Sequence, residues 1–490
     1  MGGYYLLVWV LVTAPLFRGG NRPVALLLLE LATVALAAYV VWKPKFFQHL
    51  SRPAIFLLGL MCVFPLLQLL PIPYDIWRIL PGHELYGHAL ASLGGNFTSV
   101  SYRPASLVPA LTEYSWLALL PPMAVFLYTI GLPSERLRNV VYLFLGIAIF
   151  QVVIGLRQYG VGPENPLRGN LFAEGSSAVG TYANYNHLAG LIEMALPLAI
   201  ALFIATLSSL HFSHKHSKKF LTKLSIFASF YMNRTIVFGL LAAVLLTGLI
   251  FTKSRTGIML GILVIMLCTI AFSARIGRSK ASGLIGTISF IGASLAIQIG
   301  LVPVLNRFSL ADPLHDARWS IFTSTVTAIG EFFPLGSGAG TFSQVYQRFH
   351  SPDILGVFVN RAHNDYLEWV MEGGVIAAVL IVGLILLYLV QWLRVWKRGE
   401  WTTLNFIQVG AGIGILAILL HSLVDYNLHI PANQIYLALL AALFFHRGNI
   451  RENEPIKSGT SSVQEEHEQI SALPPQKIHK PLPGPNPFAN

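Results

Sequence analysis

Long runs of apolar residues are the feature that most constrains the fold of this chain. The run after Gly374 reads VIAAVLIVGLILLYLVQWL and holds no charged residue. A helix needs about 20 apolar residues to cross a hydrocarbon core of about 30 Å, whereas barrel strands alternate apolar and polar residues. The 490 residues are 54% hydrophobic and only 11% charged. The sequence therefore predicts an all-α, polytopic membrane protein.

About 12 transmembrane helices are expected from the positions of these runs. They are placed near residues 4–17, 23–42, 53–71, 112–131, 139–158, 186–208, 235–252, 256–274, 282–301, 375–393, 403–420 and 432–446. We interpret the first run as a retained span, because it lacks a basic leading segment and an obvious cleavage site.

The positions of Lys and Arg predict the orientation, because short cytoplasmic loops are enriched in both. A cytoplasmic N-terminus puts most of the 33 basic residues into inside loops and the C-terminal tail. Both termini are then cytoplasmic. We expect a transmembrane domain over 1–446, a large helical outer loop over 302–374 that carries part of the active site, and a polar, Pro-rich, disordered tail over 447–490.

Charge and cysteine content argue against two classes of function. The net charge of +11 is mostly accounted for by inside loops that face an anionic leaflet, so we expect no nucleic-acid partner. Cys62 and Cys268 both fall within apolar spans. Free thiols there behave as small hydrophobes, so the sequence offers neither a disulfide framework nor metal-binding spacing.

The outer loop has the pattern of a folded segment. RWSIFTSTVTAIGEFF has helical spacing, and PLGSGAGTF after it is a turn in which Gly336, Gly338 and Gly340 allow unusual backbone conformations. AHNDYLEWVMEGG then leads into the next span. If that block is already helical at Arg361, Arg361 and Asp365 are spaced for an ion pair and His363 points to the opposite face. The proton partner of His363 must then come from another segment or from substrate.

Polar residues at span ends have structural and functional interpretations. Arg255 begins a span, where a buried charge costs at most ~2.5–3.5 kcal/mol, so it is either a snorkelling interfacial residue or a functional one. Asn186 and His187 at another span start would either cap a helix or hold sugar hydroxyls. His421 lies one helical turn before Asp425, which favours a self-contained His–Asp pair over a direct catalytic role.

Several motifs in combination resemble the bacterial O-antigen ligase and polymerase family. They are SRTG at a span start, PLGSGAGTF after an external helix that an arginine opens, and AHNDYLEWVMEGG before a span. YNHLAG and HSLVDYNLHIPAN are similar to that family as well. The resemblance covers about residues 180–445, and its specificity lies in the combination, because each motif alone is weak.

This resemblance implies a membrane-embedded, lipid-sugar-dependent glycosyltransferase of the bacterial inner membrane, with its active site facing the periplasm. The donor would be a glycan on undecaprenyl diphosphate. The acceptor would be the lipid A core for a ligase or a lipid-linked repeat unit for a polymerase, and a protein acceptor stays open. By motif, Arg255 and Arg318 would bind the diphosphate and His363 would activate the acceptor. The candidate substrate-binding residues are Asn186, His187, Arg361, Asn364, Tyr366 and Glu368.

The chemistry of these residue types fits those roles. Planar guanidinium groups match the oxygens of a departing diphosphate, and an imidazole is a suitable base for a sugar hydroxyl. Two charges 4 Å apart interact by about 4 kcal/mol at an effective dielectric constant of 20 but by about 1 kcal/mol in water. The outer loops lack an Asp-X-Asp pair. We therefore expect metal-independent, inverting transfer without a cofactor.

Two other classes of function remain as alternatives. A twelve-span secondary transporter usually has duplicated halves and ionisable groups or broken helices near the bilayer midplane. The main acids within the predicted spans are Glu30 and Glu193, and we expect both to be structural or helix-end residues. A non-catalytic envelope-assembly factor would leave the external arginines replaceable.

Overall fold

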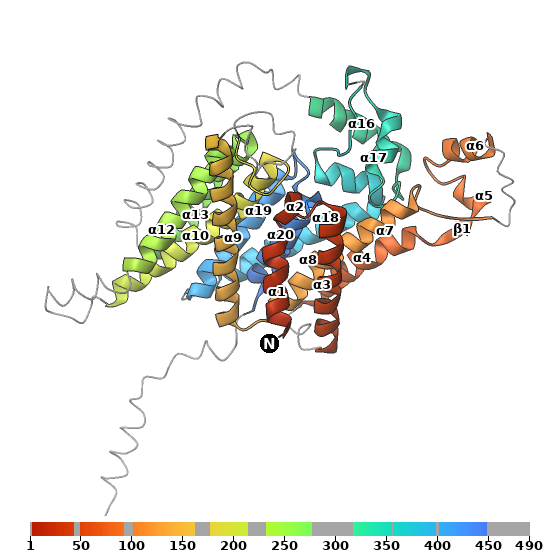
Figure 1. Ribbon diagram of the computed structural model, residues 1–490. Helices are drawn as coiled ribbons and strands as arrows, with labels where there is room; N and C mark the ends of the chain where they lie inside the picture. Colours follow the sequence, from red (N-terminus) through yellow and green to blue (C-terminus); the bar gives the residue numbers. More distant parts are fainter. Residues whose placement is uncertain are drawn as a thin grey trace, which may run out of the picture. The chain divides into compact units, whose positions relative to one another are not determined.

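The computed structural model describes residues 2–43, 50–92, 101–161, 177–213, 232–276, 317–354, 356–397 and 401–447. Internal contacts divide the chain into a large unit, Met1–His446, and a second unit, Arg447–Asn490. The predicted helix over 282–301 and nearly all of the predicted tail lie outside the described residues. Figure 1 shows the order of the elements in the large unit.

The described part of the large unit is almost entirely helical (Figure 1). Its N-terminal helices are α1 (Gly2–Thr13), α2 (Leu16–Gly19), α3 (Pro23–Trp42), α4 (Arg52–Gln68), α5 (Tyr74–Trp77), α6 (Glu84–Ser92), α7 (Pro109–Ala118), α8 (Leu120–Ile130) and α9 (Ser134–Val161). The later α-helices are α10 (Tyr185–Ser213), α12 (Met232–Thr252), α13 (Arg255–Ile276), α16 (Ala317–Phe332), α17 (Phe342–Val345), α18 (Asp365–Trp396), α19 (Thr403–His421) and α20 (Pro431–Phe445). Three 3-10 turns complete them, η6 (Tyr346–Phe349), η7 (Pro352–Ile354) and η8 (Asn427–His429).

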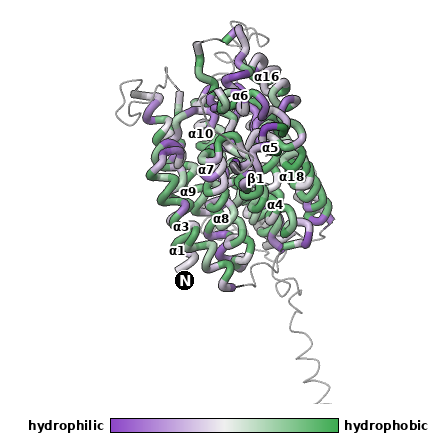
Figure 2. The backbone as a smooth tube through the Cα atoms, turned by 90° about the vertical axis from the view of Figure 1, so that its right-hand side faces the viewer, coloured by the Kyte–Doolittle hydropathy of each residue, from purple (hydrophilic) through white to green (hydrophobic). Residues whose placement is uncertain are grey.

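Within the described ranges, eight helical segments are long and apolar enough to cross a membrane, so the chain is a polytopic membrane protein. They are Pro23–Trp42, Pro109–Ile130, Ser134–Gly160, Tyr185–Ser208, Arg234–Thr252, Arg255–Ser273, Asp365–Trp396 and Thr403–His421. The shorter apolar helices α1, α4 and α20 coincide with three further predicted spans. Figure 2 shows the apolar character of these helices along their lengths.

Helix α10 lies at the centre of the bundle, because it packs against α9, α12, α13, α19 and α20. It is apolar on all sides, and almost all of its membrane-spanning residues are buried. Its backbone lies close to α19 where Gly410 faces the Pro197 carbonyl and Gly414 faces the Met194 backbone. Small residues allow membrane helices to approach this closely, since no side chain separates their backbones.

Two groups of short elements lie outside the long helices. The first is a two-stranded antiparallel sheet of β1 (Pro71–Pro73) and β2 (Tyr102–Pro104), with α5 and α6 between the strands. The second is formed by α16, α17, η6 and η7, which share an apolar core of Ile321, Phe332, Phe342, Tyr346, Val359 and Met371. The described part of the predicted outer loop therefore contains helices, and its place outside the membrane stays a prediction.

The glycine turn after α16 adopts the backbone conformations that its sequence predicts. Gly336, Gly338 and Gly340 have φ angles of +80°, +114° and +75°. The amides of Ser337 and Gly338 donate to the carbonyls of Met371 and Glu372 on α18. The turn therefore ties α16 and α17 to the first part of α18.

In Figure 1, the N-terminus of α1 lies at the lower end of the bundle, whereas α16 and α17 lie at the upper end. Figure 2 shows β1, α5 and α6, and it shows more hydrophilic residues around α6 and α16 than along the long helices. Which end faces the cytoplasm stays a prediction from the positions of Lys and Arg.

Candidate active site

His363 lies in a short non-helical segment directly before α18. The helix begins at Asp365, and the Asn364 side chain caps it by accepting hydrogen bonds from the Tyr366 and Leu367 amides at 3.1 and 3.0 Å. His363 has a φ of +52°, a region that residues other than glycine rarely occupy. The condition that this block is already helical at Arg361 is therefore not met, because the asparagine cap places the start of the helix at Asp365.

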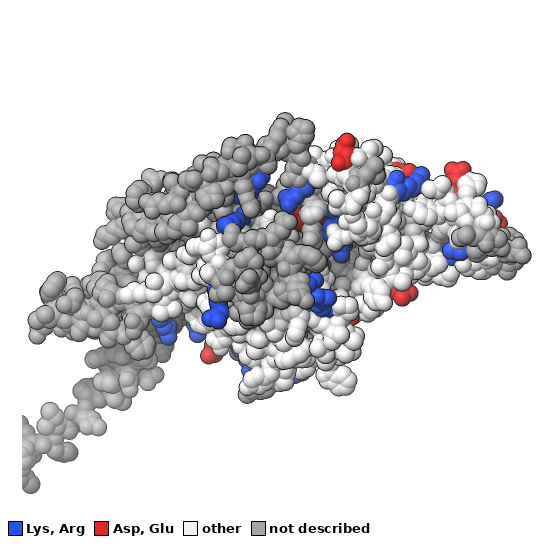
Figure 3. Space-filling view, turned by 45° about the horizontal axis from the view of Figure 1, so that its top comes forward, with Lys and Arg blue, Asp and Glu red and all other residues white. Residues whose placement is uncertain are grey.

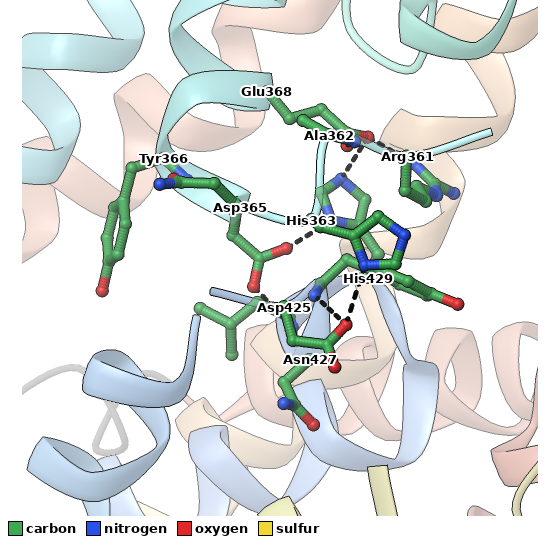
Figure 4. Close-up of polar contacts among 12 residues, drawn as sticks. Arg361, Ala362, His363, Asp365, Tyr366, Glu368, Asp425, Asn427 and His429 are labelled. Carbon is green, nitrogen blue, oxygen red and sulfur yellow. Dashed lines mark hydrogen bonds and ion pairs between the residues drawn. The ribbon is translucent and has the colours of Figure 1, made fainter. Parts of the chain in front are cut away.

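The partner of His363 comes from the segment after α19, as Figure 4 shows. Its Nδ1 lies 3.5 Å from Oδ1 of Asp425. The His363 side chain is 27% exposed and the Asp425 side chain 1% exposed. Of the two predicted sources of a partner for His363, another segment or the substrate, this contact agrees with the first. A buried carboxylate thus faces an imidazole that solvent still reaches.

Asp425 is held by neighbours from two further positions. Nδ2 of Asn186, at the start of α10, donates to Oδ2 at 2.5 Å, and the Tyr426 amide donates to Oδ1 at 2.8 Å. Burial alone would raise the pKa of Asp425, but His363, His187, His421 and Arg318 around it hold that pKa well below its ordinary value. The group is therefore an anion at neutral pH.

Arg318 reaches the same place from the first turn of α16. Its Nη1 donates to the Val424 carbonyl at 2.8 Å, one residue before Asp425. The guanidinium is thus fixed beside the His363–Asp425 pair. Figure 3 shows basic side chains spread over the face of the molecule at this end of the bundle.

Arg255 begins α13, as the sequence predicts. Gly257, two residues later, packs against Ala189 of α10, and Ala189 lies one helical turn after Asn186. The start of α13 is therefore next to the start of α10, which supplies the Asn186 contact. A joint action of Arg255 and Arg318 on one substrate stays a prediction.

His187 and Tyr426 extend the cluster. The Tyr426 ring lies edge to face between the His363 ring at 5.0 Å and the His187 ring at 4.9 Å. His187 is buried, so its predicted contact with substrate would have to occur inside the cluster. Burial and Asp425 raise the pKa of Tyr426, while a bond to Asn184 lowers it, so the phenol keeps its proton.

Four predicted substrate-binding residues make structural contacts. The Asn364 amide group donates to the Leu423 carbonyl at 2.9 Å, and the Tyr366 hydroxyl donates to the Leu419 carbonyl at 2.8 Å. Nη1 of Arg361 donates to Glu368 at 2.7 Å. Their contact with substrate stays a prediction.

The predicted ion pair between Arg361 and Asp365 does not form. Arg361 pairs with Glu368 instead, and Asp365 pairs with Nδ1 of His429 at 2.6 Å (Figure 4). The physical reason is that Arg361 lies before the start of α18, so the one-turn helical spacing between Arg361 and Asp365 is absent.

The predicted pair of His421 and Asp425 is also wrong. Nδ1 of His421 lies 2.9 Å from Glu193 of α10, and both side chains are fully buried inside the bundle. α19 ends at His421, and the chain then turns so that Asp425 points toward His363. Glu193 is therefore paired with a residue of a neighbouring span, and its structural role stays a prediction.

Sequence reasoning did not identify Asp425 and His429 as site residues. Both belong to HSLVDYNLHIPAN, a segment that the resemblance includes, but the resemblance did not indicate which residues they contact. Among the described residues, no group of three or more His, Cys, Asp or Glu side chains has the arrangement of a metal site. Metal independence stays a prediction.

Part of the chain matches a known protein family. The O-antigen ligase family matches residues 240–382, a span that contains Arg255, Arg318 and His363. No curated protein matches the chain. The predicted resemblance is thus confirmed over residues 240–382 of this polytopic membrane protein, which match the O-antigen ligase family.

Proposed function

We propose that the chain is a glycosyltransferase that moves a glycan from undecaprenyl diphosphate to a saccharide acceptor at the periplasmic face of the bacterial inner membrane. The observation that carries this proposal is the meeting of His363, Asp425 and Arg318 at one end of the bundle. The family match agrees with it, since O-antigen ligases act on glycans.

His363 is the base in this mechanism. Asp425 faces Nδ1 and, as an anion, favours the tautomer with its proton on that nitrogen. Nε2 then carries the lone pair that accepts the proton of the acceptor hydroxyl. The distance of 3.5 Å from Nδ1 to Asp425 is longer than a hydrogen bond, and such contacts tighten when substrate binds.

The arginines stabilise the leaving group. The acceptor oxygen forms a bond to the anomeric carbon while the bond from that carbon to the diphosphate oxygen breaks, which leaves the electron pair on the phosphate. Arg318, and Arg255 at the start of α13, would bind that developing charge. Direct displacement inverts the anomeric configuration.

Transfer from a purified lipid-linked glycan by the full chain in lipid nanodiscs tests this proposal. Arg318→Ala and His363→Ala should each lose at least about 100-fold in rate, and Arg318→Lys should recover little, because an ammonium group lacks the guanidinium fork. Arg348→Ala is the matched control, because Arg348 is a rim arginine that pairs with Glu331 away from the cluster. A chelator should leave the rate unchanged.

Near-normal rates in both alanine variants would remove these residues from the site. A chelator effect that added magnesium reverses would overturn the metal-independent mechanism. A ligase and a polymerase differ in the acceptor that they use. The transfer rate should therefore be measured in parallel with a lipid A core and with a lipid-linked repeat unit as acceptor.

One observation favours the transporter alternative. His421 and Glu193 form a fully buried pair between α19 and α10, and ionisable pairs within membrane spans often mark ion pathways. Proton flux through sealed proteoliposomes that disappears in Glu193→Gln would support that function. A glycan transfer that the same variant retains would support the transferase.

A further inference from the structure

A second histidine lies beside the His363 segment and contacts two buried carboxylates. His429, in η8, has its Nδ1 2.6 Å from Oδ1 of Asp365 and its Nε2 3.1 Å from Oε1 of Glu368. Both carboxylates belong to the first turn of α18 and have no exposed side-chain surface. The transfer mechanism uses none of the three groups.

We propose that His429 is a positioning residue, whose protonated ring bridges Asp365 and Glu368 and thereby holds the segment that carries His363 against Asp425. This inference rests on the proposed function, because it assigns His429 a role in that reaction. The role is indirect, since His429 acts through the carboxylates.

The two carboxylates join three segments of the chain. Oε2 of Glu368 accepts from the Ala362 amide at 2.8 Å, and Oε1 accepts from Arg361 at 2.7 Å. Oδ2 of Asp365 accepts from the Leu428 amide at 2.9 Å. The segment before α18, the first turn of α18 and η8 are therefore fixed to one another through these four oxygens and His429.

Charge balance explains why the His429 ring should be protonated. Two buried carboxylates need two cations, and Arg361 supplies one of them. An imidazolium has two N–H donors, one for each carboxylate, whereas the neutral ring has one. The charged groups around the ring are Arg361, Asp365, Glu368 and, one turn further along α18, Glu372.

The net effect of the surrounding charges also favours the protonated form of His429. Burial lowers the pKa of His429, but Glu368 and Asp365 outweigh burial and the repulsion from Arg361, so that pKa lies above its ordinary value. Protonated His429 therefore stabilises the fold fully below about pH 6.5, the ordinary histidine value, and this stabilisation is lost as the pH rises through the raised pKa.

The strained backbone of His363 makes it sensitive to this cluster. Its φ of +52° is unfavourable for a side chain with a Cβ, and such conformations persist only where the neighbouring structure holds them. Ala362 on one side is bonded to Glu368, and Asp365 on the other is bonded to His429. Loss of the charge on His429 would release both anchors and let His363 move away from Asp425.

The test compares wild type, His429→Gln and His429→Lys as full chains in nanodiscs. We expect His429→Gln to lower kcat at least about tenfold while the acceptor KM stays within about twofold. In wild type, kcat should fall at alkaline pH as His429 loses its proton. His429→Lys keeps a cation, so part of kcat should return, and this fall should occur at higher pH than in wild type. If His429 made only a structural contact, the substitution would not shift the alkaline side of the pH profile of kcat.

Hydrogen exchange provides a readout without turnover. The Ala362 amide should exchange at least about tenfold faster in His429→Gln than in wild type at one pH, while amides of α16 stay unchanged. His350→Gln is the matched control, because both His350 ring nitrogens face backbone carbonyls, at 3.2 and 2.8 Å, and no carboxylate. It should leave kcat and exchange unchanged.

If His429→Gln folds poorly, wild type alone still tests the idea. Its melting temperature should fall as the pH rises from about 6 to 9, and the Ala362 amide should lose protection over the same range. Unchanged Ala362 protection in His429→Gln, or in wild type across that range, overturns the inference even if transfer is active. A wild type that transfers no glycan instead counts against the proposed function, and leaves the exchange result to decide the positioning role.

Discussion

Asp425 is the buried carboxylate around which the residues of the candidate site gather. It accepts a hydrogen bond from Asn186, faces His363 and lies one residue after the carbonyl that holds Arg318. A buried anion needs such partners, because its desolvation cost is not otherwise repaid. In the proposed mechanism, this carboxylate favours the tautomer of His363 that carries its proton on Nδ1.

We predict that Asp425→Asn lowers kcat by about 10²–10⁴ while the protein still inserts and folds. The amide keeps the shape and can still contact Asn186, but it no longer favours a proton on Nδ1 of His363. The measurement is the single-turnover rate of glycan transfer in nanodiscs, alongside the melting temperature. Asp353→Asn is the control, since Asp353 is an exposed carboxylate of η7 that contacts Ser351. Equal rates for both variants would show that Asp425 is a structural residue.

Residue types could be predicted from the sequence, but their pairings could not. The sequence nominated His363, Arg318 and Asn186, and the structure places all three around Asp425. Helical spacing had instead paired Asp425 with His421, which is four residues away. A buried charge takes whichever partner the folded chain brings within reach, and here that partner is 62 residues earlier in the sequence.

At the scale of elements, the start of α18 shows where periodicity misleads. The spacing of acidic residues is compatible with a helix from Arg361 onward, yet the helix begins at Asp365. The signal was present in the sequence, because an asparagine before two acidic residues in a first turn is a typical N-terminal cap. Reading the cap before the periodicity would have placed His363 in the loop.

The kink in α18 gives a prediction for one glycine. Gly374 has a φ of +55°, and its conformation lets the Val375 amide donate to the Pro334 carbonyl at 2.9 Å. A Cβ at Gly374 would collide with that carbonyl. Gly374→Ala should therefore destabilise the protein by at least about 2 kcal/mol, through both backbone strain and displacement of the glycine turn.

Gly330→Ala is the matched substitution. Gly330 lies inside α16, and a Cβ there meets no atom within 4 Å. Alanine should stabilise this helix by about 0.5–1 kcal/mol, because it removes the entropy that glycine loses on folding. Thermal unfolding of the two variants in one detergent should thus shift in opposite directions. A Gly374→Ala protein as stable as wild type would contradict the strain argument.

For the whole molecule, hydropathy predicted more than any motif did. The eight long helices and the three shorter apolar ones of the described part all coincide with predicted spans, because the cost of exposing backbone groups to lipid leaves helices as the solution for such runs. Hydropathy could not predict which helix is central. α10 and α19 are apolar like their neighbours, and the close approach at Gly410 and Gly414 depends on tertiary packing.

The arrangement of the candidate site at one end of the bundle makes the sidedness of the chain testable. Gln344 in α17 is exposed, and so is Lys397 at the C-terminal end of α18. Since α18 is a predicted span, the two positions should lie on opposite sides of the membrane. Cys62 and Cys268 are the two native cysteines and can be replaced by alanine to give a background for labelling.

We predict that a membrane-impermeant maleimide labels Gln344→Cys in intact cells but labels Lys397→Cys only after the membrane is opened. The physical basis is the enrichment of Lys and Arg in loops that face the anionic cytoplasmic leaflet, which places the His363 end outside. Labelling of both variants after lysis shows that each cysteine is reactive. If Lys397→Cys reacts in intact cells and Gln344→Cys does not, the chain has the reverse orientation. The candidate site would then face the cytoplasm, and the proposed transfer at the periplasmic face would be wrong.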